Sequence, residues 1–151
     1  MNTKINLAGV ELKNPVMTAS GTFGSGMEYS EFVDLNKLGA VVTKGVANVP
    51  WPGNPTPRIA ETYGGMINAI GLQNPGIDVF CERDIPFLKK YDTKIIVNVC
   101  GKSERDYVRL WKDLQVNLWI CLKLTFPAQM SKKVELLSDR MQPILSTLQK
   151  Q

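Results

Sequence analysis

The sequence predicts an α/β fold built around a parallel sheet, and three observations predict it. Apolar runs without alternation occur at residues 15–20, 40–46 and 93–99, as in strands that are buried on both faces. Segments with helical spacing or helix-start signals come after these runs. Each run also ends in polar or small residues, at the strand end where folds of this class collect their chemistry.

The elements before the second strand are short. Residues 4–13 alternate apolar and polar around Gly9, which predicts a hairpin. The turn 21–26 has the spacing G-x-x-G-x-G, which is not the dinucleotide fingerprint. It fits a turn against a phosphate or flavin ring, and equally an ordinary strand-to-helix loop. The apolar spacing within 28–38 predicts a short helix.

A long loop, residues 44–76, follows the second strand and is rich in Gly, Pro and Asn. Loops of this length in a compact domain are usually functional. Lys44 at its start, with Asn68 and Asn74 near its end, predicts a pocket for a small, planar, anionic ligand. Trp51 fits either a lid or a partner contact. Asn74 also fits an ordinary turn, because it precedes Pro-Gly.

Two helices and a strand are predicted beyond the loop. Residues 77–91 have helical spacing that is interrupted near Pro86. Residues 93–99 form the third strand. Ser103, followed three residues later by Asp106, predicts the N-cap of another helix.

Composition excludes several classes of function. The chain has 151 residues, 44% of them apolar, which is enough for one domain with a core. Its net charge of +4 is scattered along the sequence and disfavours nucleic-acid binding. The three cysteines lack CxxC spacing, so we expect neither a disulfide framework nor a metal site, and Cys81 and Cys100 fit packing positions. No signal sequence or membrane span is evident, and we expect a cytoplasmic protein.

Four consecutive motifs resemble the class 1 dihydroorotate dehydrogenases: LKNPVMTASGTFG, LGAVVTKGV, GNPTPRIAET and GMINAIGLQNPG. NAIGLQNPG and LNKLGAVVTKGV point to the NAD-linked bacterial subclass. The resemblance covers residues 3–109 and implies the N-terminal part of a TIM (β/α)8 barrel. It implies an FMN enzyme that oxidises dihydroorotate to orotate in pyrimidine (UMP) biosynthesis. It also implies an oligomeric assembly, with a partner subunit whose FAD and iron–sulfur cluster pass electrons to NAD.

The resemblance further implies the site residues. Ala19 and Ser20 match positions against the flavin. Lys44 and Gly45 match the lysine motif that contacts flavin and substrate, and Asn98 matches a flavin-contacting strand end. The substrate contacts implied are Lys44, Asn68, Ala69, Ile70, Gly71 and Leu72. Outside the motif, Lys44 fits a strand-end lysine that reaches solvent, and Asn98 fits an amide that satisfies backbone groups at a strand end.

After Arg109 the resemblance ends. The family continues with EINISCPN, whose cysteine is the general base, whereas residues 122–129 here read LKLTFPAQ, and all twelve glycines precede residue 102. Codons for 122–130 can be chosen that spell EINISCPN when read in a shifted frame. We therefore divide the chain into a barrel portion, 1–109, and an out-of-frame tail, 110–151. The alternative is a genuine C-terminal helix.

This division predicts weak or no FMN binding and no turnover, because the general-base cysteine is absent. Two other functions stay open: a different FMN barrel, of the dihydropyrimidine or dihydrouridine type, and a non-catalytic remnant.

Overall fold

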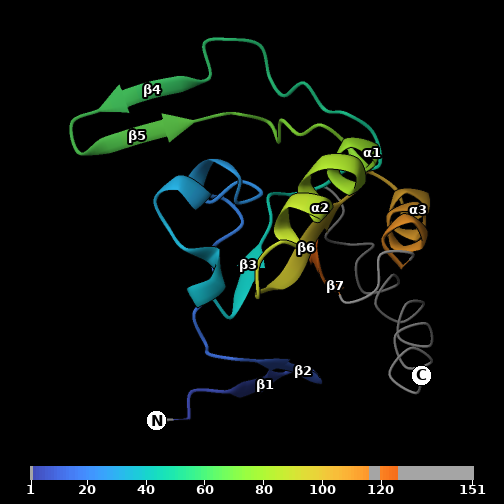
Figure 1. Ribbon diagram of the computed structural model, residues 1–151. Helices are drawn as coiled ribbons and strands as arrows, with labels where there is room; N and C mark the ends of the chain where they lie inside the picture. Colours follow the sequence, from blue (N-terminus) through green and yellow to red (C-terminus); the bar gives the residue numbers. More distant parts are fainter. Residues whose placement is uncertain (1, 116–119, 126–151) are drawn as a thin grey trace.

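The computed structural model describes residues 2–115 and 120–125 (Figure 1). Its centre is a parallel sheet with the strand order β3-β6-β7. In β3–β6 Val41 pairs with Ile95, and in β6–β7 Val97 pairs with Leu122. The strands are β3 (Ala40–Val42), β6 (Lys94–Cys100) and β7 (Ile120–Thr125). The predicted α/β class with a parallel sheet is confirmed over the described residues.

One continuous helical stretch follows the long loop and precedes β6 (Lys94–Cys100). It comprises α1 (Ile77–Val79), a π-helical turn, η3 (Phe80–Asp84), and α2 (Ile85–Leu88). The predicted interruption near Pro86 is a π turn immediately before it: the N–H of Ile85 donates to the carbonyl of Phe80, five residues back. Proline has no N–H to donate to the preceding turn, so the irregularity falls there.

The second helix, α3 (Glu104–Gln115), links β6 to β7. The N-cap prediction at Ser103 is confirmed, since the amide of Asp106 donates to the Ser103 Oγ at 3.4 Å. Asp106 Oδ2 in turn accepts from the amides of Lys102 and Ser103, at 2.8 and 2.9 Å. The carboxylate thus satisfies two amides at the start of α3.

The core lies between the sheet and these helices. Along β6, Ile95, Val97 and Val99 belong to the cluster that includes Phe80 and Tyr107, as alternation along a strand requires. On the other face, Ile96 packs with Val42, Ala40 and Leu12. Both faces of β3 and β6 are therefore apolar where the helices and the N-terminal hairpin cover them.

The N-terminal hairpin is confirmed, with β1 (Ile5–Leu7) paired to β2 (Val10–Leu12). The strand predicted at residues 15–20 is wrong, because only a single bridge, Met17 to Ala40, forms there. The hydroxyl of Thr18 accepts from the amide of Val42 and donates to its carbonyl, taking the place of backbone pairing.

The helix predicted at 28–38 is also wrong. Two 3-10 turns form instead, η1 (Glu28–Glu31) and η2 (Leu35–Lys37). They are separated because Asp34 is extended, with ψ of 104°, and its side chain accepts from the amide of Asn36. Aspartate favours this local cap over the helix interior.

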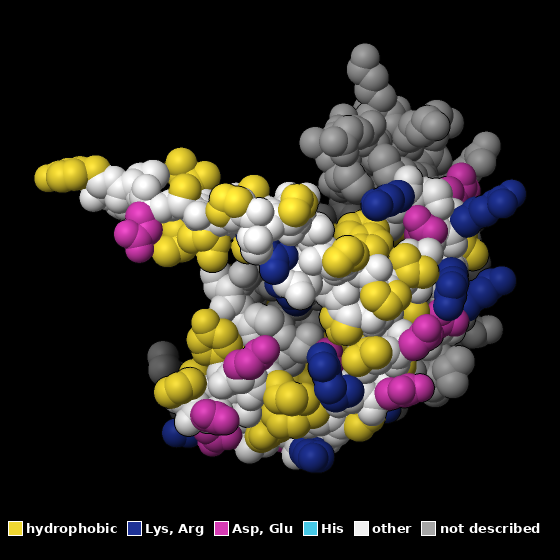
Figure 2. All heavy atoms as spheres, turned by 90° about the horizontal axis from the view of Figure 1, so that it is seen from above, with side chains coloured by type: hydrophobic (Ala, Val, Ile, Leu, Met, Phe, Trp, Pro, Cys, Tyr) yellow, Lys and Arg dark blue, Asp and Glu magenta, His cyan; other side chains and the backbone are white. Residues whose placement is uncertain are grey.

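The long loop contains a hairpin that the sequence did not predict: β4 (Ile59–Thr62) pairs antiparallel with β5 (Gly65–Asn68). Every residue of both strands is exposed. Figure 2 shows this hairpin as an arm that projects beyond the rest of the described surface. Neither face is buried, so no apolar alternation marked it in the sequence.

In the described part of the chain, no helix is long and apolar enough to cross a membrane. The division expected after Arg109 falls inside α3. Residues 116–119 and 126–151 of the expected tail lie outside the described residues, as does the alternative C-terminal helix.

Candidate functional site

The segment after β3 is fixed beside the end of β6. The amide of Lys44 donates to the carbonyl of Gly24 at 2.8 Å, and the amide of Val46 donates to the carbonyl of Asn98 at 2.7 Å. The amide of Cys100 then donates to Val46 at 2.9 Å. Lys44 and Asn98 therefore stand at the carboxyl ends of adjacent parallel strands, as the sequence predicted.

Gly45 is the point at which three parts of the chain meet. A Cβ there would lie 2.9 Å from Leu72 Cδ1, 3.2 Å from Cys100 Sγ and 3.8 Å from Asn98 Nδ2. A side chain at this position would make the Leu72 side chain shift. The structure thus brings together Gly45, Leu72 and Asn98, three of the residues that the sequence singled out.

Cys100 belongs to this cluster by packing. It is buried, and burial raises the pKa of its thiol to about 12. Burial also raises the pKa of Cys81, with further contributions from the carboxylates of Asp113, Asp78 and Glu82. Both thiols are protonated at neutral pH, which agrees with their interpretation as packing residues.

Ala19 and Ser20 follow Thr18, whose hydroxyl bonds to Val42. Ala19 is exposed and Ser20 is half-buried, and the carbonyl of Ala19 accepts from the amide of Thr22 at 3.1 Å. These two residues therefore lie just beyond a backbone position tied to β3.

The segment Asn68–Leu72 is largely exposed. Asn68 ends β5, and the carbonyls of Ala69 and Ile70 accept from the side chain and the amide of Asn54, both at 2.9 Å. These two hydrogen bonds join the segment to Asn54, in the same loop. Leu72 is the residue of the segment that lies against Gly45.

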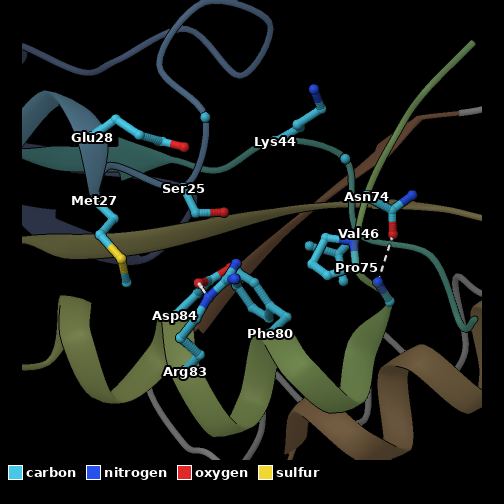
Figure 3. Close-up of a pocket in the computed structure, with 13 residues that line it drawn as sticks. Ser25, Met27, Glu28, Lys44, Val46, Asn74, Pro75, Phe80, Arg83 and Asp84 are labelled. Atoms are coloured by element: carbon cyan, nitrogen blue, oxygen red, sulfur yellow. Dashed lines mark hydrogen bonds and ion pairs between the residues drawn. The ribbon is translucent and has the colours of Figure 1, made fainter. Parts of the chain in front are cut away.

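A cavity of about 250 Å³ lies between the end of β3 and the helical stretch α1–α2 (Figure 3). Of the three residues predicted for the loop pocket, Lys44 and Asn74 line this cavity and Asn68 does not. The side chain of Lys44 points away from the helix. Arg83 and Asp84 line its helical wall. The sequence analysis missed both.

Asp84 is 2% exposed and accepts from Arg83 Nε at 2.6 Å and from Nη2 at 3.3 Å. This hydrogen bond raises the pKa of Arg83. A signal was available in the sequence: Ile77, Phe80 and Leu88 mark the apolar face, and Asp84 occupies a position on that same face. A carboxylate at such a position needs a partner.

Comparison with known proteins places these features in a family. Residues 2–127 match the family model described as "Dihydroorotate dehydrogenase". The chain is 76% identical over 110 residues to the "Dihydroorotate dehydrogenase B (NAD(+)), catalytic subunit" of Lachnoclostridium phytofermentans, covering 73% of this chain and 37% of that protein. It is 71% identical over 114 residues to the protein of the same name from Alkaliphilus metalliredigens, covering 76% of this chain and 38% of the relative.

A solved structure shares the fold. The dihydroorotate dehydrogenase of Eimeria tenella, crystallised in complex with ferulenol, superposes with a TM-score of 0.55 at 21% sequence identity. The match covers 76% of this chain and 33% of that one. The chain therefore spans little more than a third of the length of the relatives that it matches.

Proposed function

The chain belongs to the dihydroorotate dehydrogenase family, and from that membership we propose that residues 2–109 supply the first part of a flavin- and pyrimidine-binding edge. The catalytic subunit to which this edge belongs oxidises dihydroorotate to orotate in UMP biosynthesis. The observation that carries the proposal is the meeting of Gly45, Asn98 and Leu72 beside Lys44, at the carboxyl ends of β3 and β6. Ligand sites of parallel α/β folds lie at these strand ends.

The chemistry of these side chains suits FMN. The Lys44 ammonium provides positive charge, the Asn98 amide and the Ser20 hydroxyl provide hydrogen-bonding groups, and Gly45 leaves its backbone accessible for close approach. FMN, when bound, accepts the hydride removed from dihydroorotate. Lys44, with Ala19, Ser20, Gly45 and Asn98, would hold the flavin, and the lysine charge would stabilise negative charge that develops during transfer.

The pyrimidine would be held between Lys44 and the segment Asn68–Leu72. Lys44 suits the carboxylate of dihydroorotate, and Asn68 offers a donor and an acceptor to the imide edge. The exposure of this segment supports the proposal, because a loop that encloses a ligand must be able to move away from it.

The relatives' name, a catalytic subunit of an NAD(+)-linked enzyme, supports an electron-transfer partner. We propose that this partner carries FAD and an iron–sulfur cluster and passes the electrons to NAD in the cytoplasm.

We further propose that residues 110–151 are translated out of frame, although the match to the family model extends to residue 127. The general-base cysteine would then be lost, since residues 122–129 read LKLTFPAQ. The 151-residue chain would bind FMN weakly and would not turn over.

DNA sequencing across codon 109 tests the proposal that the tail is out of frame, and an intact reading frame with no lost base would contradict that proposal.

A chain with the reading frame restored tests the proposed function, and we expect this chain to oxidise dihydroorotate. Lys44→Ala should lower this rate by about 10²–10³-fold, the usual effect of removing one charge-stabilising group. Lys89→Ala, at an exposed lysine that follows α2 and does not line the cavity, is the control. Oxidation of dihydropyrimidines or dihydrouridine in place of dihydroorotate would overturn the assignment.

A further inference from the structure

Asn74 joins the two limbs of the long loop, residues 47–51 and 74–76. It is 6% exposed, and its Oδ1 accepts from the amide of Ala47 at 3.2 Å and from the amide of Gly76 at 2.9 Å. Its backbone exchanges two hydrogen bonds with Trp51, both at 3.0 Å. One asparagine thus holds the start of the long loop against its end.

The two amide donors fix how the side chain is oriented. An amide oxygen can accept from both, whereas an amide nitrogen cannot, so the oxygen must face Ala47 and Gly76. The Nδ2 group then points elsewhere, and among the residues that the structure describes nothing accepts a hydrogen bond from it. The contacts of Asn74 with the loop therefore use the oxygen.

The backbone at Gly76 packs closely against the start of the long loop. Gly76 has a φ of +86°, and a Cβ there would lie 2.8 Å from the backbone nitrogen of Pro50. The two limbs of the loop are thus in backbone contact where Asn74 links them. Leu72, two residues before Asn74, is the residue that lies against Gly45.

From these contacts we propose that Asn74 is a positioning residue: its side-chain oxygen sets the segment Asn68–Leu72 against Lys44 and Gly45. This proposal rests on the proposed function in so far as that segment contacts the pyrimidine. Without the two bonds, the segment keeps its internal contacts to Asn54 but loses its fixed position relative to β3.

Site-resolved hydrogen exchange on the full chain tests the proposal. In the wild type, the amides of Ala47 and Gly76 should be protected. Asn74→Ala should speed their exchange by at least about fivefold, the loss of one hydrogen bond each. The amides of Val97 and Val99 in β6 should change much less. Asn74→Asp keeps an acceptor oxygen at the N-terminal end of the helical stretch and should retain protection.

Asn36→Ala is the matched control. Asn36 Oδ1 also accepts a backbone amide from a distant segment, that of Asp92 at 2.9 Å. Asn36→Ala should speed exchange of the Asp92 amide and leave the amides of Ala47 and Gly76 protected. If Asn74 only stabilised the fold, Asn74→Ala would speed exchange at the β6 amides as much as at Ala47 and Gly76. That result would overturn the proposal. Unprotected Ala47 and Gly76 amides in the wild type would overturn it without any variant.

Titration of the frame-restored chain with orotate, with its unsubstituted form as the wild type, separates this inference from the function. Asn74→Ala should weaken orotate binding, and Asn74→Asp should restore it. Suppose that both variants lose orotate affinity equally while Asn74→Asp keeps its amides protected from exchange. The Nδ2 group would then contact the ligand directly, and the positioning role would be overturned. Absence of orotate binding in the wild type would count against the proposed function, while exchange would still decide the role of Asn74.

Discussion

The parallel sheet and the projecting hairpin differ in what holds them. In β6, six of seven residues are buried, whereas in β4 and β5 every residue is exposed. The sheet is held by apolar packing on both faces. The hairpin is held by its own inter-strand hydrogen bonds, and an isolated two-stranded hairpin is marginally stable in water. The chain thus combines a packed scaffold, which fixes Lys44 and Asn98, with a hairpin whose residues are all exposed.

The reactivity of the cysteines tests how closed the scaffold is, and it carries the largest expected effect. Because burial raises the pKa of Cys100 to about 12, its thiolate population at pH 8.5 should be about 10³-fold below that of an ordinary thiol. Alkylation mapped by mass spectrometry should leave Cys100 unlabelled in the folded chain and label it in denaturant. Rapid labelling of native Cys100 would show that the sheet end is open.

The same shift has a consequence for stability. A thiol whose pKa is higher in the folded chain contributes stability that is complete below its unfolded value, near 8.5, and is lost as the pH rises towards 12. Chemical denaturation from pH 8 to pH 11 should show this decline, and Cys100→Ala should reduce it.

Paired truncations compare the two regions directly. Leu88 is fully buried, and Leu88→Ala should lower the free energy of unfolding by about 2–5 kcal/mol through the cavity that it leaves. Ile67 in β5 is 64% exposed, and Ile67→Ala should change the free energy of unfolding by less than about 0.5 kcal/mol. Urea denaturation measures both. Similar costs at the two sites would mean that the hairpin packs against something in solution.

Asp106 connects the scaffold to the loop. It accepts from the amides of Lys102 and Ser103 and from Asn48 Nδ2 at 2.8 Å. Asp106→Ala should cost about 1–2 kcal/mol, as the loss of a helix-capping residue does. Asp106→Asn keeps an acceptor and should cost less, and equal unfolding midpoints for the two variants would contradict the capping role.

The smallest expected effect concerns Trp51 and Lys102, whose Nζ lies 4.8 Å from the ring centroid. Lys102→Gln should cost about 0.5–1 kcal/mol and speed proteolysis within the loop. Lys90→Gln is the control, because Lys90 lies 5.8 Å from the Phe87 ring within the scaffold. Its loss should leave loop proteolysis unchanged.

Prediction from sequence succeeded where burial follows a local pattern. The apolar residues within 93–99 indicated β6, and Ser103 with Asp106 indicated the start of α3. Prediction failed where side chains replaced backbone partners. Thr18 bonds to Val42 and reduces a predicted strand to one bridge, and Asp34 divides a predicted helix into two turns. These competing hydrogen bonds depend on what lies nearby in space.

The amino-acid sequence by itself determined the α/β class, the motifs of the family and the positions of Lys44 and Asn98 at strand ends, because strand burial and strand-end chemistry are written in consecutive residues. Tertiary structure alone decided that Leu72 meets Gly45 and that Asn74 joins the two limbs of the loop. The physical reason is that each of these contacts joins groups whose neighbours are set by the folded chain, and neither spacing nor composition encodes which atoms will meet.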